Sequence, residues 1–439
     1  MPENLRKYRL PPKCGATRSW YRRCHIAIIP VGVLPRRARS KTGRPLSRWR
    51  RRTLPVLCRI TLLGKKASLR SRFAVFVAIV QLILFFGHFS IYETWRYFSA
   101  PADPALTTFL RALLVVLSVT FVPASVLAFR YNNILLRAFY TLASIWLGLL
   151  NFLFLASALY WTTLAAAAVL RLHLSQPALG YSLFALAVLV SLYGFVNAAA
   201  TRVRRIHVAL PRLPKAWIGR TAAFVSDTHL GHVRGYAFIS RIVAMLRQLR
   251  PDIIFIAGDV FDGTKVEPNH LAAPWSNLTP PLGKFFVTGN HEEFSDSSQY
   301  VDALRRSGVR VLLNESVTVD SLQLIGVTYS TLAHPESFRS ALQAAAAGSN
   351  GASTLLAHAP HSLSIAEEMG VSLQLTGHTH RGQTFPFTWF TSRIFGKFTY
   401  GLHQHGALRV YTSSGAGTWG PPMRVGTRPE IVLIRFEKS

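Results

Sequence analysis

Acidic residues are scarce in this chain of 439 residues, which has 19 Asp and Glu against 50 Lys and Arg and a formal net charge of +31. A balance this basic excludes an acidic, solvating protein and favours anionic partners such as a lipid surface or a nucleic acid. Cysteine is also scarce, since the only three are Cys14, Cys24 and Cys58. No disulfide framework can form beyond residue 58, so a reducing compartment is acceptable for the rest of the chain.

Much of the positive charge lies at the start of the chain, where residues 1–72 hold 21 of the 50 basic residues and one acid, Glu3. The segment has no helical or strand periodicity, so we expect a basic, disordered tail. Three interpretations remain open. The tail binds anionic lipid, at about 1 kcal/mol per basic residue near the surface; it binds nucleic acid; or translation starts downstream of it. Pro30 and Pro35 break its short apolar stretches, which argues against a signal peptide.

Charge is nearly absent from four stretches between residues 73 and 200. They lie near 73–92, 112–129, 139–161 and 178–200. Each is long enough, at about 18–23 residues, to cross a hydrocarbon core of roughly 30 Å. A helix on the surface of a soluble protein has a polar face, whereas these stretches are apolar all round. The sequence therefore predicts four transmembrane helices, with the alanine-rich residues 164–170 either extending the third helix or forming a short external one.

The orientation of these spans is predicted from the basic residues that flank them. Such residues precede the first span, lie between the second and third, and follow the fourth, at Arg70, Arg72, Arg130, Arg137, Arg202, Arg204, Arg205, Arg212 and Lys215. The two other loops are poorer in positive charge. By the positive-inside rule, we expect a protein of the inner cell membrane whose two chain ends both lie in the cytoplasm. We expect residues 201–215 to be a basic linker and residues 216–439 to be a separate cytoplasmic domain.

Five short motifs in that domain are rich in residues that bind metals. They are Asp227-Thr-His229, Gly258-Asp259-Val-Phe-Asp262, Gly289-Asn290-His291-Glu292, His358 and Gly377-His378-Thr-His380. Any one of them alone could be a turn or a helix cap. However, each follows a strand-like apolar run, and the ends of neighbouring strands meet at one edge of a sheet. We therefore expect these side chains to converge.

The five motifs, in this order, resemble the calcineurin-like (purple acid phosphatase-type) metallophosphoesterases. The resemblance runs from about Ile218 to the C-terminus. The segment from Ser414 to Pro421, with Arg424 and Pro429-Glu430-Ile431, looks like the membrane-attached bacterial branch, which includes transmembrane proteins with a metallophosphoesterase domain. Arg381 departs from the pattern, because close relatives often have a small residue there, and it could alter substrate contacts.

The resemblance implies an α/β fold of two packed mixed β-sheets flanked by helices, with two divalent metal ions at one edge. Asp259 would bridge the ions. One ion would take Asp227, His229 and His380, and the other would take Asn290, His358 and His378. Oxygen and imidazole ligands without thiolate suit Mn, Fe, Zn or Ni. The ligand types do not distinguish among these metals.

The resemblance also implies hydrolysis of phosphodiesters or phosphomonoesters by a metal-activated hydroxide. His291 would protonate the leaving group or stabilise the phosphoryl oxygens, and Asp262 would orient His291. The substrate would be a phosphorylated small molecule, a nucleotide or a lipid-linked phosphate. We expect no role for the other histidines of the domain, which are His232, His270, His334, His361, His403 and His405. An aromatic cluster, formed by Trp389, Phe390, Phe395 and Phe398, is either loop core or an apolar lip.

Two alternatives remain. The domain could be a receptor or structural partner that binds a phosphorylated ligand without turnover, although a complete ligand set argues for an enzyme. It could also be a nuclease, as the basic charge suggests. The charge is concentrated in the tail and at the membrane flanks, whereas a nuclease needs it beside the metals, so nucleic acid is the less favoured substrate.

Overall fold

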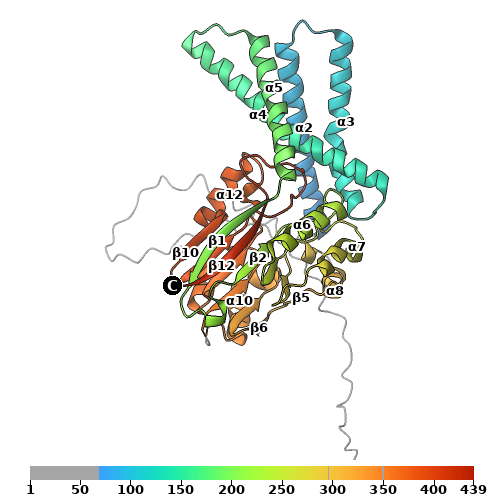
Figure 1. Cartoon of the computed structure of the whole chain (residues 1–439). Coiled ribbons are helices and arrows are strands. Elements are labelled where there is room, and N and C mark those ends of the chain that lie inside the picture. Colours follow the sequence, from blue (N-terminus) through green and yellow to red (C-terminus); the bar gives the residue numbers. More distant parts are fainter. Residues whose placement is uncertain (1–68, 295, 349–350) are drawn as a thin grey trace, which may run out of the picture. The chain divides into compact units, whose positions relative to one another are not determined.

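The computed structural model describes residues 69–294, 296–348 and 351–439. The expected basic tail and the three cysteines lie outside these residues, except that the first described helix already includes residues 69–72. Four long helices come first and an α/β domain follows (Figure 1).

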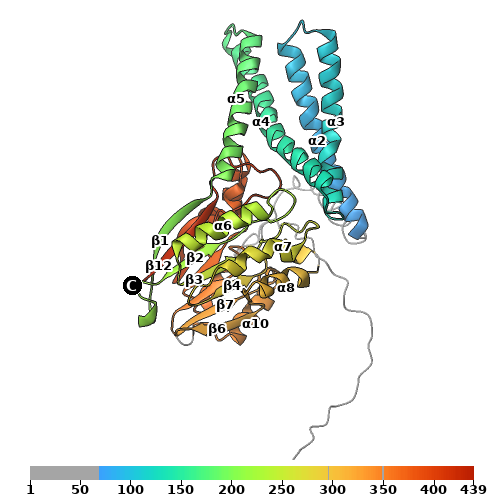
Figure 2. The same cartoon turned by 45° about the vertical axis from the view of Figure 1, so that its right-hand side comes forward.

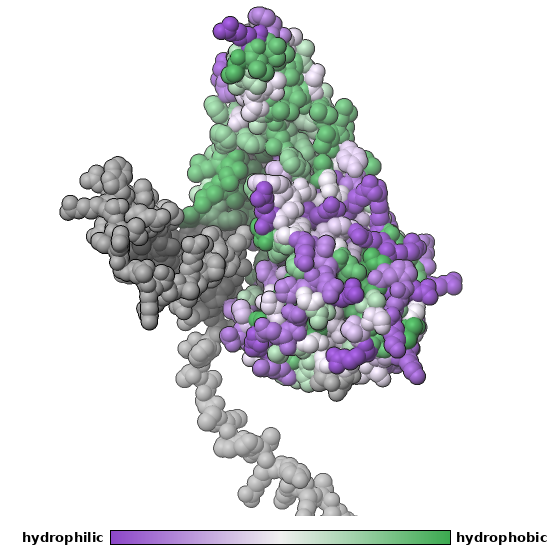
Figure 3. Space-filling view, turned by 90° about the vertical axis from the view of Figure 1, so that its left-hand side faces the viewer, coloured by the Kyte–Doolittle hydropathy of each residue, from purple (hydrophilic) through white to green (hydrophobic). Residues whose placement is uncertain are grey.

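The four expected spans are helices. They are α2 Leu69–Phe98, α3 Pro104–Ala128, α4 Ile134–Leu170 and α5 Gln176–Ala199. All four are long and apolar enough to cross a membrane, as predicted. Hydrophobic residues gather on their surface (Figure 3), and Leu82 and Val196 are 65% and 71% exposed. Apolar surface of this extent needs a lipid environment.

Helix α4 includes the alanine-rich residues 164–170, which therefore extend the third span. Its 37 residues correspond to a length of about 55 Å, almost twice the thickness of a hydrocarbon core. A helix of this length fits a bilayer only if it is tilted or leaves the hydrocarbon. Both views of the bundle show α4 running obliquely past α2 and α5 (Figures 1 and 2).

The α/β domain contains two six-stranded mixed sheets, as expected. The first has the order β1-β12-β2-β3-β4-β5, with bounds Arg202–Leu210, Glu430–Lys438, Thr221–Val225, Ile253–Ala257, Lys284–Val287 and Arg310–Val311. The second has the order β10-β11-β9-β8-β7-β6, with bounds Gly401–His405, Leu408–Thr412, Leu373–Thr376, Ser353–Leu356, Leu322–Gly326 and Glu315–Val319. The central strands β2, β3 and β4 are parallel, as are β7, β8, β9 and β11.

The two sheets pack face to face, and helices cover their outer faces. Strand β3 illustrates why: Ile253, Phe255 and Ala257 point into the core between the sheets, while Ile254 and Ile256 point to the helical side. A strand that is apolar on both faces must be covered on both. The first sheet is covered by α6 Tyr236–Leu249, α7 Pro268–Ala272 and α8 Ser298–Arg306, and the second by α9 Tyr329–Leu332, α10 Pro335–Ala344 and α11 Leu363–Glu368. A further helix, α12, spans Phe387–Phe395.

The expected linker 201–215 differs from the structure. Residues 202–210 form strand β1, which pairs in parallel with β12 along its whole length, from Arg202 opposite Glu430 to Leu210 opposite Lys438. Three of the first four residues of the strand are arginines, which the edge of a sheet tolerates because one side needs no partner. Its basic, alternating sequence therefore gave a linker-like signal that tertiary pairing overrides.

Hydrogen bonds join the membrane helices to the α/β domain. Asn197 on α5 is buried, and its side-chain amide donates to the carbonyl oxygens of Arg424 at 2.9 Å and Thr427 at 2.7 Å. The backbone N–H of Arg424 donates in turn to the carbonyl oxygen of Gly194 at 2.9 Å. A Cβ added at Gly194 would lie 2.6 Å from the Met423 side chain, so only glycine permits this close approach.

Replacing Asn197 by Ala should destabilise this contact, because two buried carbonyl oxygens would lose their donor at a cost of about 1–3 kcal/mol each. We expect the apparent unfolding temperature of the detergent-solubilised chain, followed by tryptophan fluorescence, to fall by several degrees. Asn132→Ala makes the same chemical change in an exposed loop and should leave this temperature unchanged. Equal unfolding temperatures for the two variants would contradict the proposed contribution of Asn197.

Candidate metal centre

The candidate ligands lie where strands end, as the sequence predicts. Asp227 follows β2, Asp259 follows β3 and Asn290 follows β4, all in the first sheet. His358 follows β8 and His378 follows β9, in the second sheet. The carboxyl ends of these strands meet where the two sheets pack together, so residues 150 positions apart in the sequence become neighbours.

Three groups of potential ligand atoms form there. They are Asp227, His229 and His380; His229, Asp259 and His291; and Asp259, His358 and His378, with the ligand atoms of each group within 4.8 Å of one another. His229 and Asp259 each belong to two groups, which makes the centre continuous. The Oδ1 atom of Asn290 completes it, at 2.9 Å from His378 Nδ1 and 3.1 Å from His358 Nε2. All seven candidate ligands are therefore brought together.

The backbone at the centre is held in an unusual conformation. Five candidate ligands have positive φ angles: Asp227, His229, Asp259, His378 and His380, at 52°, 47°, 51°, 68° and 48°. This left-handed region costs a residue with a side chain roughly 1 kcal/mol or more, and such strain persists where the surrounding structure enforces it. The strain turns each side chain toward the common centre directly after its strand.

The arrangement fits divalent cations better than hydrogen bonding. His229 Nε2 and His380 Nε2 face each other at 2.8 Å, and His358 Nε2 lies 3.1 Å from Asp259 Oδ2. The Nδ1 atom of His358 donates to the Ala257 carbonyl oxygen at 2.8 Å, so its Nε2 atom is the one directed at the centre. Acceptor atoms that converge in a buried site need positive charge between them. The carboxylate, amide and imidazole donors are consistent with a site for two metal ions.

The electrostatics show the same need for positive charge. Burial raises the pKa of Asp227 to about 6 against the lowering effect of His358. Burial would lower the pKa of His358, but the carboxylates of Asp259 and Asp227 raise it to about 10. Burial and the neighbouring His358 lower the pKa of His378 to about 3. The two carboxylates therefore favour positive charge at this point of the centre.

His291 is positioned differently from what the sequence predicts. Its Nδ1 atom donates to the backbone carbonyl oxygen of Asp262 at 2.8 Å. The carboxylate of Asp262 instead accepts from the N–H and the hydroxyl of Thr264, at 2.8 and 2.5 Å. The expected orientation of His291 by Asp262 therefore uses the main chain, and the carboxylate holds the turn that presents this carbonyl. Burial raises the pKa of Asp262 to about 6.

The Nε2 atom of His291 is left facing the centre, 4.0 Å from Asp259 Oδ2. Its ring packs against Phe294 and Trp419, with centroid distances of 4.4 and 5.6 Å. These two aromatic rings shield the imidazole. Trp419 lies in a loop outside the five metal-binding motifs, so its position beside His291 could not be predicted from the sequence. His361, for which we expected no role, has its ring 6.2 Å from that of His378. His232 has a structural role, since its Nε2 atom donates to the Ala128 carbonyl oxygen at the end of α3.

These observations can be compared with known proteins. A family model described as calcineurin-like phosphoesterase matches residues 221–382. An uncharacterized metallophosphoesterase of Aquifex aeolicus is 30% identical over 257 residues, which make up 57% of this chain and 98% of the relative. The chain belongs to the calcineurin-like metallophosphoesterase family.

Two other relatives have names that describe a membrane protein with a metallophosphoesterase domain. Proteins called transmembrane protein with metallophosphoesterase domain, from Danio rerio and Bos taurus, are 31% and 33% identical over 57% and 58% of this chain. This metallophosphoesterase covers 61% and 62% of those two relatives, which is less than two thirds of their length.

Glu292 supports the centre of this metallophosphoesterase without being a candidate ligand, and nothing in the sequence singles it out from its motif. Its buried carboxylate accepts three backbone N–H groups, from Asp259 and Phe261 at 2.9 Å and from Gly289 at 2.8 Å. Burial and the Asp259 charge raise its pKa to about 8, and the N–H groups of Phe261 and Gly289 oppose that rise. Glu292 thus ties the loop after β3 to the loop after β4.

Arg424 supports the other side of the centre. Its guanidinium is fully buried and donates to the carbonyl oxygens of Ser414 and Gly417, both at 2.7 Å, and of His380 at 3.3 Å. Burial lowers the pKa of Arg424 to about 10. These hydrogen bonds hold a glycine-rich loop against the turn that carries His380.

Glu292→Gln should weaken metal binding, because one of the three N–H donors would then face the side-chain NH₂ group of the new residue. Loss of a hydrogen bond behind the ligands typically costs 10–100-fold in metal affinity. We expect that loss for Mn²⁺ in isothermal titration calorimetry of the full chain. Glu315→Gln, on an exposed position of β6, is the matched control and should bind as the parent does. Unchanged affinity in Glu292→Gln would show that the loop geometry does not depend on this carboxylate.

Proposed function

We propose that the chain is a membrane-anchored, dinuclear metal-dependent phosphoesterase that hydrolyses phosphodiester or phosphomonoester bonds on the cytoplasmic side of the cell membrane. The observation that carries the proposal is the convergence of seven candidate ligands around Asp259, with the free Nε2 atom of His291 beside them. Asp227, His229 and His380 would hold one ion and Asn290, His358 and His378 the other, with Asp259 shared. Bound divalent ions supply Lewis acidity at phosphoryl oxygens and make water a better nucleophile.

His291 would act on the leaving group. A carbonyl oxygen can only accept, so the bond to Asp262 keeps a proton on Nδ1 of His291. A second proton, on Nε2, would therefore be available for the oxygen that leaves phosphorus. The surrounding Phe294 and Trp419 rings restrict the imidazole and exclude water from its faces.

The receptor alternative would require this machinery to bind without turnover, and no contact of His291 in the described residues favours that. The nuclease alternative needs basic side chains that are available beside the centre, and two arginines there are already engaged within the described part of the chain. Arg424 donates to backbone carbonyls, and the guanidinium of Arg381, the residue that departs from the family pattern, lies 4.6 Å above the Tyr400 ring. Salt-sensitive binding of DNA by residues 69–439 would revive the nuclease alternative.

The cytoplasmic side is supported by the basic residues between the second and third spans and after the fourth. Both flanks adjoin the α/β domain. The flank after the second span does so because Ala128, at the end of α3, accepts hydrogen bonds from Lys265 and His232. The flank after the fourth span leads directly into strand β1 of the domain. The basic loop and the catalytic domain thus lie on one side of the bundle.

The test uses the full chain in detergent, since a fragment that starts at residue 216 would remove strand β1 from the first sheet. With Mn²⁺ the protein should hydrolyse bis-p-nitrophenyl phosphate, and a chelator should abolish the activity. His291→Ala should lower kcat by a factor of about 10²–10⁴, the usual contribution of a general acid, while the bound metal remains. His173→Ala, in the exposed loop before α5, is the matched control.

Metal content, measured on the same preparations by elemental analysis, separates the outcomes. Full metal content with low activity in His291→Ala supports general acid catalysis. A folded, metal-loaded parent protein that is inert on this ester and on p-nitrophenyl phosphate would overturn the enzyme and favour the phosphate-binding receptor.

A further inference from the structure

One cavity in the structure indicates the class of substrate of the proposed phosphoesterase. A pocket of about 660 Å³ lies between helices α2 and α4 and the part of the α/β domain that carries His378 and His380. Its volume falls within the range of roughly 300–1,000 Å³ that is usual for ligand sites. The pocket therefore joins the candidate metal centre to the membrane helices.

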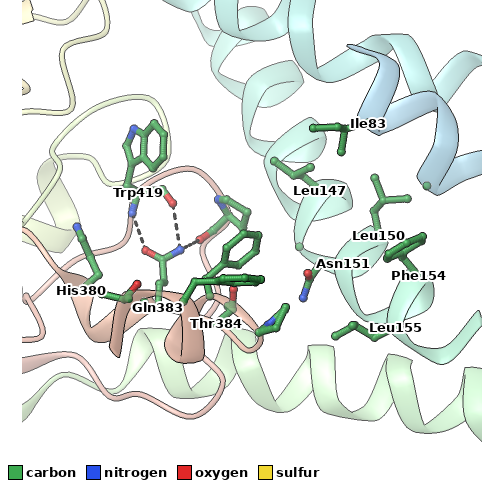
Figure 4. A pocket seen from close by; sticks show the side chains of 18 of the residues that line it. Ile83, Leu147, Leu150, Asn151, Phe154, Leu155, His380, Gln383, Thr384 and Trp419 are labelled. Atoms are coloured by element: carbon green, nitrogen blue, oxygen red, sulfur yellow. Dashed lines mark hydrogen bonds between the residues drawn. The ribbon is translucent and has the colours of Figure 1, made fainter. Parts of the chain in front are cut away.

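The membrane side of the pocket is apolar. In Figure 4 the side chains of Ile83 from α2 and of Leu147, Phe154 and Leu155 from α4 face residues of the loop after His380. The other side includes Phe387 and Phe390 of α12. A guest in this space would contact hydrocarbon on most of its surface.

Two polar side chains of the lining, Gln383 and Asn151, are already bonded within the protein. The amide nitrogen of Gln383 donates to the carbonyl oxygens of Trp419 at 3.0 Å and Pro421 at 3.1 Å, and its oxygen accepts from the Trp419 N–H. Asn151 donates to the Phe385 carbonyl oxygen at 3.0 Å. The lining therefore offers a sugar or nucleobase fewer partners than its polar groups need, and a buried polar group without a partner is unfavourable. An alkyl chain has no such groups.

The opposite end of the pocket reaches the candidate metal ligands His378 and His380. We infer that the substrate is a membrane lipid with a phosphoester head, whose alkyl chain occupies this pocket while the phosphoester reaches the metal centre. This inference rests on the proposed function and names its substrate class. An amphiphile is the kind of molecule that matches a cavity with hydrocarbon walls and a metal site at one end.

The walls also indicate where the lipid comes from. Phe86 of α2 lines the pocket and is 61% exposed on the surface of a candidate membrane span. Helix α12 has no buried residue, and Phe387, Trp389, Phe390 and Ile394 are all exposed on it. An alkyl chain can therefore move from the bilayer into the pocket along apolar side chains. The aromatic cluster expected from the sequence divides accordingly: Trp389 and Phe390 are exposed, whereas Phe398 packs into the core of the second sheet.

Gly87 of α2 offers a way to fill the pocket. It lines the cavity, and a Cβ at this position would make only ordinary contacts, at 3.7 Å from the Leu150 side chain. Gly87→Leu should therefore add bulk where the alkyl chain would lie. Ala112→Leu adds a similar bulk to an exposed position of α3 that does not line the pocket, and is the matched control.

The first test needs no activity. The full chain, freed of metal with a chelator, is embedded in nanodiscs that contain phosphatidic acid with a photoreactive diazirine in one acyl chain. Cross-links to residues 382–391 are then measured by mass spectrometry. We expect Gly87→Leu to reduce their yield at least fivefold relative to Ala112→Leu. Equal yields in these two variants would overturn the inference, whatever the activity of the protein.

The second test measures the ratio of kcat/KM for p-nitrophenyl decyl phosphate to that for p-nitrophenyl methyl phosphate. Each buried methylene contributes about fourfold, so we expect Gly87→Leu to lower this ratio at least tenfold relative to Ala112→Leu. Because all variants share one detergent, partition of the decyl ester into micelles cancels. Equal loss of both esters in Gly87→Leu would contradict the inference.

A replacement variant and a defined negative outcome complete these tests. Leu155→Trp fills the same pocket from α4 and replaces Gly87→Leu if that variant does not fold. Absence of hydrolysis of either ester by the metal-loaded parent, together with pocket-dependent cross-linking, would overturn the proposed function and leave a lipid-binding pocket.

Discussion

The carboxylate of Asp259 is the group around which the rest of the structure is organised. It is buried at the meeting point of the two sheets, accepts the backbone N–H of His291 at 2.9 Å and lies 3.1 Å from His358 Nε2. Burial would raise the pKa of Asp259, but His358, His291 and His229 hold it well below its usual range. A buried charge that loses its partner costs about 3–5 kcal/mol, so positive charge must always be present at this point. Divalent cations held by the surrounding ligands would provide this charge.

The surrounding chain satisfies this constraint through close backbone approach. A Cβ at Gly289 would lie 2.1 Å from Asp259 Oδ1, so the loop after β4 can pass the carboxylate only as glycine. Glu292 then holds both loops together by their N–H groups, and left-handed φ angles aim the ligands inward. The favourable free energy of packing the apolar cores of the two sheets offsets this strain. The chain's own contacts consequently hold the candidate ligands in this geometry.

Much of the centre could be predicted from the sequence because it depends on local rules. A ligand residue after an apolar run identifies a strand end, and parallel strands bring such ends together. The features that could not be predicted depend on tertiary partners. Strand β1 is recognisable only beside β12, and Asp262 acts through its carbonyl because Thr264 occupies its carboxylate. Glu292 and Trp419 become relevant through contacts with residues that the sequence does not place near them. The four spans were predicted because hydrocarbon imposes a simple length rule, whereas the pocket between them and His380 required the packed structure.

The segment around residues 421–427 explains why the membrane helices are more than a tether. Arg424 presents its side chain to the carbonyl oxygen of His380, while its backbone N–H and C=O bond to Gly194 and Asn197 of α5. Met423 is completely buried and belongs to the same hydrophobic core cluster as Leu150 and Ala187 of the helical bundle. One short segment is thus shared by the membrane helices and by the turn that holds a candidate ligand. Without the helices, Met423 would be exposed and the backbone of Arg424 would lose its partners, so the membrane helices contribute directly to the structure that positions His380.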